Sequence, residues 1–309
     1  MLNVFAITSP LFTLIFLGYL AVKTNLLPAG LLPGIARFVL YFCVPGVILS
    51  NFLRSDQHPV FEPDFLKLYA IIGLVTLALG FIINLLLKRE SAHASIFALG
   101  GALPNSMFVG FPVLLQVTPE IAVQVLVMCI LVENVIVMPI SLLLADISSA
   151  SGDSLNQRLQ KIGKRMINNP MLISVVLGLV LSSMDIYAPA FLQTTLDMLA
   201  KAAAPAALVF IGGALVGHQV KGDITAILTT ACSKLILMPL IAIAALAFSA
   251  PLPGQLGIAL VLIAASPMLS IYAIIASNYG VGKAAASIQV FTTGASFITL
   301  NAFLAYLLI

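Results

Sequence analysis

The sequence predicts an all-α integral membrane protein of ten transmembrane helices, arranged as two inverted repeats of five. Hydrophobic residues make up 61% of the 309 residues and charged residues only 8%, against about 25% charged residues in soluble domains. Apolar stretches of about 20 residues, long enough to cross a bilayer as helices, recur from one end of the chain to the other. Prolines and glycines recur at a constant spacing between the two halves. These patterns leave no segment for a separate soluble domain.

The expected helices are apolar stretches bounded by charged residues, proline or glycine. They cover residues 4–22, 34–53, 65–87, 92–117, 120–145, 169–184, 190–217, 223–249, 254–279 and 283–308. The sixth stretch is short. An even number of spans places both termini on the same side of the membrane.

Basic residues indicate which side is cytoplasmic. Ten of them lie in or beside the odd-numbered loops: Lys23, Arg37, Lys88, Arg89, Arg158, Lys161, Lys164, Arg165, Lys221 and Lys283. Only Arg54 and Lys67 lie near even-numbered loops. Because cytoplasmic loops carry the excess of Lys and Arg, both termini are expected on the extracytoplasmic side.

The long connection at residues 146–168 separates a first repeat, residues 1–145, from a second, residues 169–309. It opens with a polar run at residues 148–153 and continues with apolar residues at helical spacing and basic residues between them. The apolar positions are Leu155, Leu159, Ile162 and Met166, and the basic ones are Arg158, Lys161, Lys164 and Arg165. This pattern is typical of an amphipathic helix on an anionic membrane surface; a docking site for a partner is the alternative.

A repeat is indicated by pairs of residues that lie 160 positions apart. The pairs are Pro10 and Pro170, Gly18 and Gly178, and Pro45 and Pro205. With five helices in each half, the second copy enters the membrane from the opposite face, so the repeat is inverted, as in many secondary transporters.

Two corresponding helices, the fourth and the ninth, carry prolines in mid-span, within residues 103–112 and 265–272. Proline lacks an amide donor and clashes with the carbonyl four residues earlier, so each helix should kink or break near the membrane centre. Asn105, and Ser266 before Pro267, are residue types that cap a new helix. The free amides of such a helix attract anions. A kinked structural helix is the alternative.

The sequence Leu-Pro-Asn-Ser-Met-Phe-Val-Gly-Phe-Pro at residues 103–112 closely resembles the crossover motif of the auxin efflux carrier family. That family includes plant PIN exporters and bacterial organic-acid permeases. Residues 234–239 in the eighth helix, and the stretch from Ser266-Pro267 to residues 278–280, are also similar to it. A long hydrophilic loop of the plant type is absent from the sequence, so the resemblance is to the bacterial branch, which includes malonate permeases.

This resemblance implies a ten-helix fold shared with sodium/bile acid symporters. In that fold helices 1, 2, 6 and 7 form a scaffold, helices 3–5 and 8–10 form a moving transport domain, and the broken helices 4 and 9 cross at the substrate site. Asn105 then corresponds to the asparagine that contacts the substrate carboxylate, and Pro104 and Pro267 to the crossover prolines. The candidate substrate-binding residues are Pro104, Asn105, Ser106, Ser266, Pro267, Met268 and Ser270. Met268, Leu269 and Ser270 differ from plant members, which bears on the substrate.

Four further polar residues are candidates for coupling or support. Glu133 and Lys234 each lie near the middle of a span, where an ionisable group usually faces a partner or a cavity. They form either a structural ion pair or part of a coupling site, and Glu133 resembles an acidic position near the family's ion or proton site. Gln289 and Thr292 lie on one polar face of the tenth helix, where packing and an ion path are both open interpretations. Asp197 and Lys201, four residues apart, are expected to neutralise each other.

The sequence predicts no enzyme, because no Ser/His or paired-Asp constellation lies at membrane depth and no phosphate-binding loop is present. Cys43, Cys129 and Cys232 have no metal-ligand spacing, so no metal site is expected, although sodium is a candidate coupling ion beside H+. No cofactor is expected. The net charge of +3 does not indicate a nucleic-acid partner, because topology explains the basic residues.

The predicted function is therefore a secondary active transporter of the plasma membrane, the inner membrane of a bacterium. It moves a small organic carboxylate, either a malonate-like dicarboxylate or an auxin-like weak acid, by elevator-type alternating access. The alternatives are a passive anion channel or uniporter and a membrane sensor that transports nothing. The expected partners are the substrate and the lipid bilayer, and a homodimer is a candidate assembly.

Overall fold

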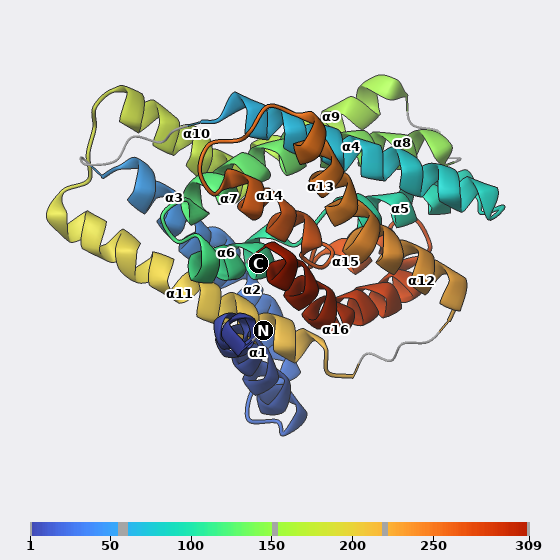
Figure 1. Ribbon diagram of the computed structural model, residues 1–309, viewed down its shortest axis with the longest axis horizontal. Coiled ribbons are helices and arrows are strands. Elements are labelled where there is room, and N and C mark those ends of the chain that lie inside the picture. The colour runs from blue at the N-terminus through green and yellow to red at the C-terminus, as the bar shows by residue number, and fades with distance from the viewer. Residues whose placement is uncertain (1, 55–60, 150–153, 218–221, 308–309) are drawn as a thin grey trace.

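The computed structural model describes residues 2–54, 61–149, 154–217 and 222–307 (Figure 1). Over these ranges the chain is helical, and its one strand-like feature is an isolated antiparallel bridge between Pro104 and Met268. Residues 150–153 of the expected polar run and Lys221 of the topology argument lie outside the described residues.

The helices follow the expected spans closely. The first half contains α1 (Leu2–Lys23), η1 (Ala29–Leu31), α2 (Leu32–Phe38), η2 (Val39–Cys43), α3 (Val44–Phe52), α4 (Pro63–Leu86), α5 (Ser91–Ala102), η3 (Ser106–Gly110), α6 (Phe111–Val117), α7 (Ala122–Val132), η4 (Glu133–Val137) and α8 (Met138–Ser148). After α9 (Leu155–Ile167) come α10 (Pro170–Ser183), α11 (Ala190–Ala214), α12 (Ile224–Cys232), η5 (Ser233–Leu237), α13 (Met238–Phe248), α14 (Leu256–Ala265), α15 (Tyr272–Ser277) and α16 (Gly282–Leu307).

Six continuous helical stretches in the described residues are long and apolar enough to cross a membrane. They are Ala29–Phe52, Pro63–Leu86, Ala122–Ser148, Ala190–Ala214, Ile224–Phe248 and Gly282–Leu307. Shorter apolar helices cover Thr8–Lys23, Ser106–Val117 and Leu256–Ala265, and α9 meets α10 at an angle of 63°. The protein is therefore a multi-pass helical membrane protein.

Three of the long helical stretches and the shorter helix Ser106–Val117 each contain a π-helical segment of five residues, and each segment ends two residues before a proline. The segments are η2, η3, η4 and η5, and the prolines are Pro45, Pro112, Pro139 and Pro239. Because a proline ring clashes with the carbonyl four residues earlier, the backbone widens there instead of continuing as a regular α-helix. Glu133 is the first residue of η4 and Lys234 the second of η5, so both mid-span charges lie on widened turns.

Glycines allow α1 and α11 to touch through their backbones. A Cβ atom added at Gly18 would lie 2.2 Å from the carbonyl oxygen of Val209, and one at Gly212 would lie 1.8 Å from that of Ile15. Small residues at a helix contact are the usual means of close packing in membranes. The two helices thus form a tight pair.

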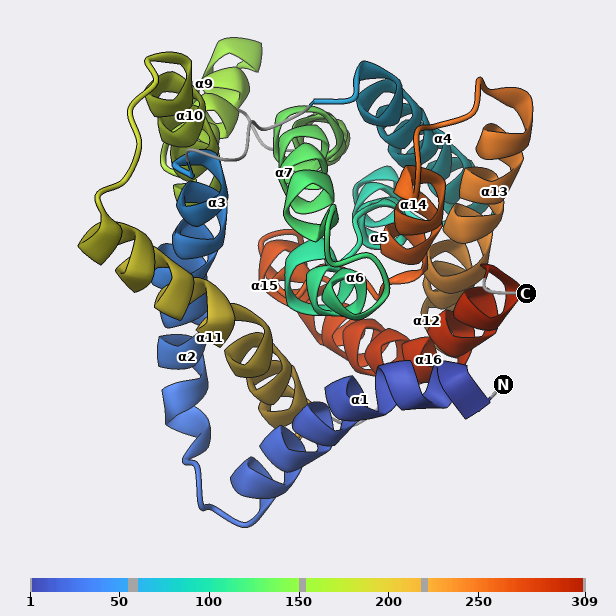
Figure 2. The same ribbon diagram turned by 60° about the vertical axis from the view of Figure 1, so that its left-hand side comes forward.

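Figure 2 shows α2, α3, α10 and α11 along one side of the molecule, with α4, α5, α7 and α12–α16 gathered opposite. The first and last helices meet, because the Thr8 hydroxyl donates to Oδ1 of Asn301 at 2.8 Å and the Phe12 and Phe297 rings pack edge to face. The two ends of the described chain therefore lie together.

Polar contacts join loops that lie far apart in the sequence. Arg89 forms an ion pair with Asp223 at 2.7 Å, which connects the third and seventh loops. The hydrogen bond from Arg89 holds the pKa of Asp223 below its ordinary value. The expected pairing of Asp197 with Lys201 is wrong, since Asp197 instead pairs with Arg54 at 2.8 Å. The Arg54 guanidinium, from the chain just after α3, thus reaches the carboxylate that was expected to pair with Lys201.

Candidate functional site

Two helices break and their extended segments pair. The first helix stops at Ala102 and resumes at Ser106, and the second stops at Ala265 and resumes at Tyr272. Between the breaks the Asn105 amide donates to the Pro267 carbonyl at 2.7 Å, and the Leu269 amide donates to the Leu103 carbonyl at 3.0 Å. Backbone groups that lose helical partners at the prolines therefore satisfy each other across the crossing.

Asn105 caps the helix that follows the first break. Its Oδ1 accepts a hydrogen bond from the Phe108 amide at 3.2 Å, the arrangement expected of a helix N-cap. Its Nδ2 donates to Oγ of Ser270 at 2.6 Å. The residue is only 5% exposed. Its buried side-chain amide thus caps the half-helix after the first break and contacts the segment that interrupts the second helix.

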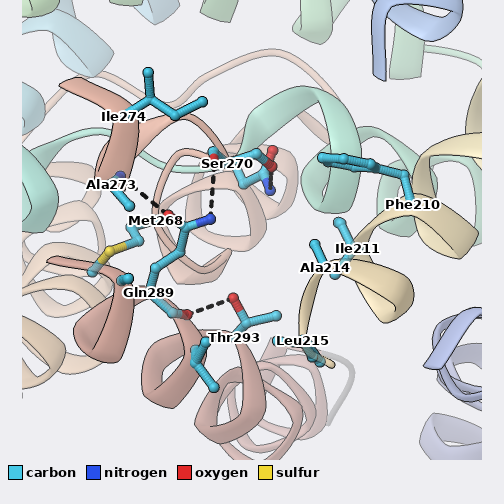
Figure 3. Close-up of a pocket in the computed structure, with 13 residues that line it drawn as sticks. Phe210, Ile211, Ala214, Leu215, Met268, Ser270, Ala273, Ile274, Gln289 and Thr293 are labelled. Carbon is cyan, nitrogen blue, oxygen red and sulfur yellow. Dashed lines mark hydrogen bonds between the residues drawn. The ribbon is translucent and has the colours of Figure 1, made fainter. Parts of the chain in front are cut away.

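The second break is capped differently from the expectation. The Ser266 hydroxyl donates back to the Leu262 carbonyl at 3.1 Å and caps no new helix. Figure 3 shows that Gln289 reaches the break instead: its Oε1 accepts from the Ala273 amide at 3.2 Å and its Nε2 donates to the Ser270 carbonyl at 2.7 Å. The expected Ser266 cap is therefore wrong, because a non-helical segment that ends in a turn at Ser270 and Ile271 separates Ser266 from the helix that resumes at Tyr272.

Two cavities adjoin at this crossing. The larger, of about 420 Å³, extends from the crossing to α10 and the end of α9. Its polar lining residues include Asn105, Ser106, Glu133, Asn134, Arg165, Asn169, Ser270 and Asn278. The smaller, of about 240 Å³, is bordered by Gln289 and Thr293 of α16. Asn105, Phe210, Ser270 and Ile274 line both cavities.

Glu133 faces the larger cavity and is held by two hydroxyls. Its Oε1 accepts hydrogen bonds from Tyr69, at 2.5 Å, and from Ser106, the first residue of the half-helix after the break. The residue is only 8% exposed. A buried carboxyl group that shares a cavity with the helix start can change the charge of that cavity when it gains or loses a proton.

Lys234 is fully buried and contacts the other broken helix. Its Nζ donates to the Ala264 carbonyl at 2.6 Å and to Sδ of Met238 at 3.2 Å. Ala264 lies in the last turn of α14, where carbonyls lack helical partners and the helix dipole is negative. Lys234 therefore caps the end of a half-helix. Within the described part of the chain it forms no direct ion pair with Glu133.

Some of the other candidate site residues line a cavity and some do not. Met268 and Ser270 line the smaller cavity, and Pro104 lines the larger. Ser266, Pro267 and Thr292 line neither; the Thr292 hydroxyl bonds the Ile288 carbonyl of its own helix. Its neighbour Thr293 borders the smaller cavity instead.

Several lining residues were not found from the sequence, among them Asn134, Asn169, Arg165 and Phe210. Asn169 caps α10 and its Nδ2 donates to Oδ1 of Asn134 at 2.8 Å. An asparagine before a proline signals a helix start, but only the tertiary structure shows that it borders a cavity. The described residues hold no cluster of three or more His, Cys, Asp or Glu side chains that could bind a metal.

The sequence profile of the membrane transport protein family matches residues 4–305, nearly the whole chain. The chain belongs to this family. The membrane transport protein family is the auxin efflux carrier family that residues 103–112 resemble, so that resemblance is confirmed. Its members are transporters and not enzymes.

Among relatives, a protein named "Putative malonate transporter" from Rhizobium meliloti (strain 1021) is 26% identical over 296 residues, covering 95% of this chain and 92% of the relative. The uncharacterized transporter YfdV of Escherichia coli (strain K12) is 26% identical over 75% of this chain and 74% of its own. The mouse lysosomal cholesterol signaling protein is 24% identical over 74% of this chain, which corresponds to 28% of that longer protein.

Proposed function

We propose that this membrane transport protein is a secondary active transporter that moves a small organic carboxylate by elevator-type alternating access. The observation that carries the proposal is the position of Asn105. It is buried, it starts a half-helix where two broken helices cross, and it borders both cavities. A symmetric pair of broken helices is the best structural pointer to a transport site in such folds.

The chemistry of the crossing favours an anion. The start of a half-helix presents amide groups and the positive end of a dipole, and the Asn105 amide adds a neutral donor. The candidate substrates are a malonate-like dicarboxylate and an auxin-like weak acid. The named relative supports the dicarboxylate, and a cavity of about 420 Å³ has room for either.

We further propose ten spans in two inverted repeats, residues 1–145 and 169–309, with residues 146–168 as a cytoplasmic linker. The six long stretches supply six of these spans. The other four are α1, α10 and the two broken helices, which are α5 with α6 and α14 with α15. Helices 1, 2, 6 and 7 would form the scaffold, and helices 3–5 and 8–10 the transport domain. The basic loops support extracytoplasmic termini in a plasma membrane.

For coupling, Glu133 is the proposed proton-sensitive group, with Na+ as the other candidate ion. An anionic substrate in the larger cavity is repelled by an ionised Glu133 and less so by a neutral one. Substrate binding and protonation are then linked. Lys234 and Gln289 support the two breaks through the contacts they make with α14 and α15.

The test is accumulation of radiolabelled malonate in proteoliposomes under an imposed pH or sodium gradient. A secondary transporter concentrates malonate inside against its own gradient, whereas a channel only equalises it. Binding of malonate without any flux would favour a sensor, a function compatible with the signaling role in the name of the mouse relative. If malonate neither binds nor crosses the membrane but a monocarboxylate is transported uphill, the substrate is a weak acid of the auxin-like class.

A further inference from the structure

The larger cavity is lined by a basic residue that has no role in the proposed function. Of the described residues that line it, Arg165 is the only basic one, and Glu133 is the only acidic one. Arg165 comes from α9, the amphipathic helix between the two halves. The cavity that begins at Asn105 therefore reaches a guanidinium group.

The local structure holds the end of α9 at the cavity. The helix starts at a capping box formed by Ser154 and Gln157, and Ile162 is buried against the core. Two residues after α9, Asn169 starts α10 and bonds to Asn134 in the cavity wall. The segment that carries Arg165 is thus anchored on both sides.

The Arg165 guanidinium is available to a ligand. No ion pair or hydrogen bond among the described residues includes it. The nearby charged groups are Glu133 in the cavity, Arg158 on α9, and Asp146, which accepts a hydrogen bond from Tyr279 at 2.5 Å. Lys161 and Lys164 line a separate hollow outside the larger cavity, and only Arg165 borders both.

On the basis of the proposed function, we propose that Arg165 is a specificity-determining residue that favours doubly charged carboxylates over singly charged ones. Coulomb energy is proportional to ligand charge, so one positive charge at the cavity stabilises a bound dianion about twice as strongly as a monoanion of the same size. Arg165 also offsets the repulsion that Glu133 exerts on the same ligand.

The experiment compares malonate with its monomethyl ester, a monoanion of similar size. The affinity of each is measured by calorimetry on the purified full-length chain, for wild type, Arg165→Gln, Arg165→Lys and Lys164→Gln. Arg165→Gln should weaken malonate binding about 10-fold and ester binding about 3-fold. The ester carries half the charge of malonate and loses half the Coulomb energy, so its fold-change is about the square root of that for malonate. Arg165→Lys keeps the charge and should keep the preference. Lys164→Gln, with the same charge change outside the cavity, should change neither affinity by more than about 2-fold.

Equal losses for the two ligands in Arg165→Gln, or no loss, would overturn the role of Arg165 while leaving the proposed function intact. A loss in Arg165→Gln that appears only in vesicles with anionic lipid and is absent with zwitterionic lipid would assign Arg165 to the membrane surface and overturn the proposal. If the wild type binds neither compound, malonate-like dicarboxylates are excluded as substrates of the proposed function, and the role of Arg165 fails with them. Equal melting temperatures of the ligand-free variants show that folding is not the cause.

Discussion

The Asn105 side chain donates a hydrogen bond of 2.6 Å to the Ser270 hydroxyl, which joins the two broken helices at the border of both cavities. A ligand that enters either cavity therefore meets the same pair of side chains. Because the Asn105 carbonyl oxygen also caps the half-helix at Phe108, a change at this pair reaches the helix start directly.

Asn105→Ala should weaken malonate binding about 10- to 100-fold, because a hydrogen bond to a charged ligand contributes about 1.5–3 kcal/mol. It should also lower the free energy of unfolding by about 1 kcal/mol through loss of the cap. Calorimetry on the folded variant measures the first effect. The matched control is Asn278→Ala, which removes an amide from the same cavity but not from the crossing. Normal binding by a folded Asn105→Ala protein would show that the site lies elsewhere.

Glu133→Gln should flatten the pH dependence of malonate transport. Glutamine keeps an acceptor for the Tyr69 and Ser106 hydroxyls but cannot change charge. The measurement is the initial uptake rate in proteoliposomes at several pH values. Glu120→Gln, at an exposed position, is the control and should retain the wild-type profile. An unchanged profile in Glu133→Gln would reduce Glu133 to a structural residue.

The positions of the breaks could be predicted from the sequence because the cause is local. Pro104 and Pro267 lack amide donors, and asparagine is a capping residue wherever it starts a helix. Ser266 has the same local chemistry, yet Gln289, from another helix, caps the second break. Which of two polar groups reaches a free amide depends on tertiary packing, which the local sequence does not contain.

The partners and positions of charged residues also depend on tertiary packing. Asp197 has Lys201 four residues away, but it pairs with Arg54, which is distant in sequence and lies just after α3. Arg165 fits the polar face of an amphipathic helix, and its place at the cavity depends on how α9 turns into α10. The proline two residues beyond each π-helical segment is a local signal for the widened turn. The spans predicted from the sequence are nevertheless uninterrupted helices around η4 and η5.

Lys234→Met should destabilise the protein by about 1–3 kcal/mol, because the buried Ala264 carbonyl loses its donor. The chain has no tryptophan, so unfolding can be followed with a thiol-reactive dye that labels the buried Cys43 and Cys129 as they become exposed. Lys201→Met, at an exposed position, is the control. The loss should persist in a Glu133→Gln background; if that background abolished it, Lys234 would act chiefly through Glu133.

Asp223→Asn should lower stability at neutral pH by up to about 1 kcal/mol, the range for exposed ion pairs. Asparagine also caps helices, so the change isolates the charge from the cap that Asp223 provides to α12. Since Arg89 lowers the pKa of Asp223 from its ordinary 3.8, the pair contributes stability above that value and loses it as the pH falls through the lowered pKa. The difference from wild type should therefore disappear once the pH lies below the lowered pKa of Asp223. Asp64→Asn, in a more exposed pair with Lys67, should show a smaller difference at every pH.

Gly212→Ala and Gly294→Ala should have opposite effects on stability, although both add one methyl group to a glycine inside a helix. At Gly294 nothing lies within 4 Å of the added Cβ, so only the better helix propensity of alanine acts, and the free energy of unfolding should rise by about 0.5–1 kcal/mol. At Gly212 the Cβ would lie 1.8 Å from the backbone oxygen of Ile15. A backbone atom cannot rotate away as a side chain can, so α1 must move from α11, at a cost of about 1–3 kcal/mol or more.

Dye-monitored melting of the two variants measures the contrast. Equal melting temperatures would mean that α1 is not packed on α11 through Gly212, and that the close pairing of these helices is wrong.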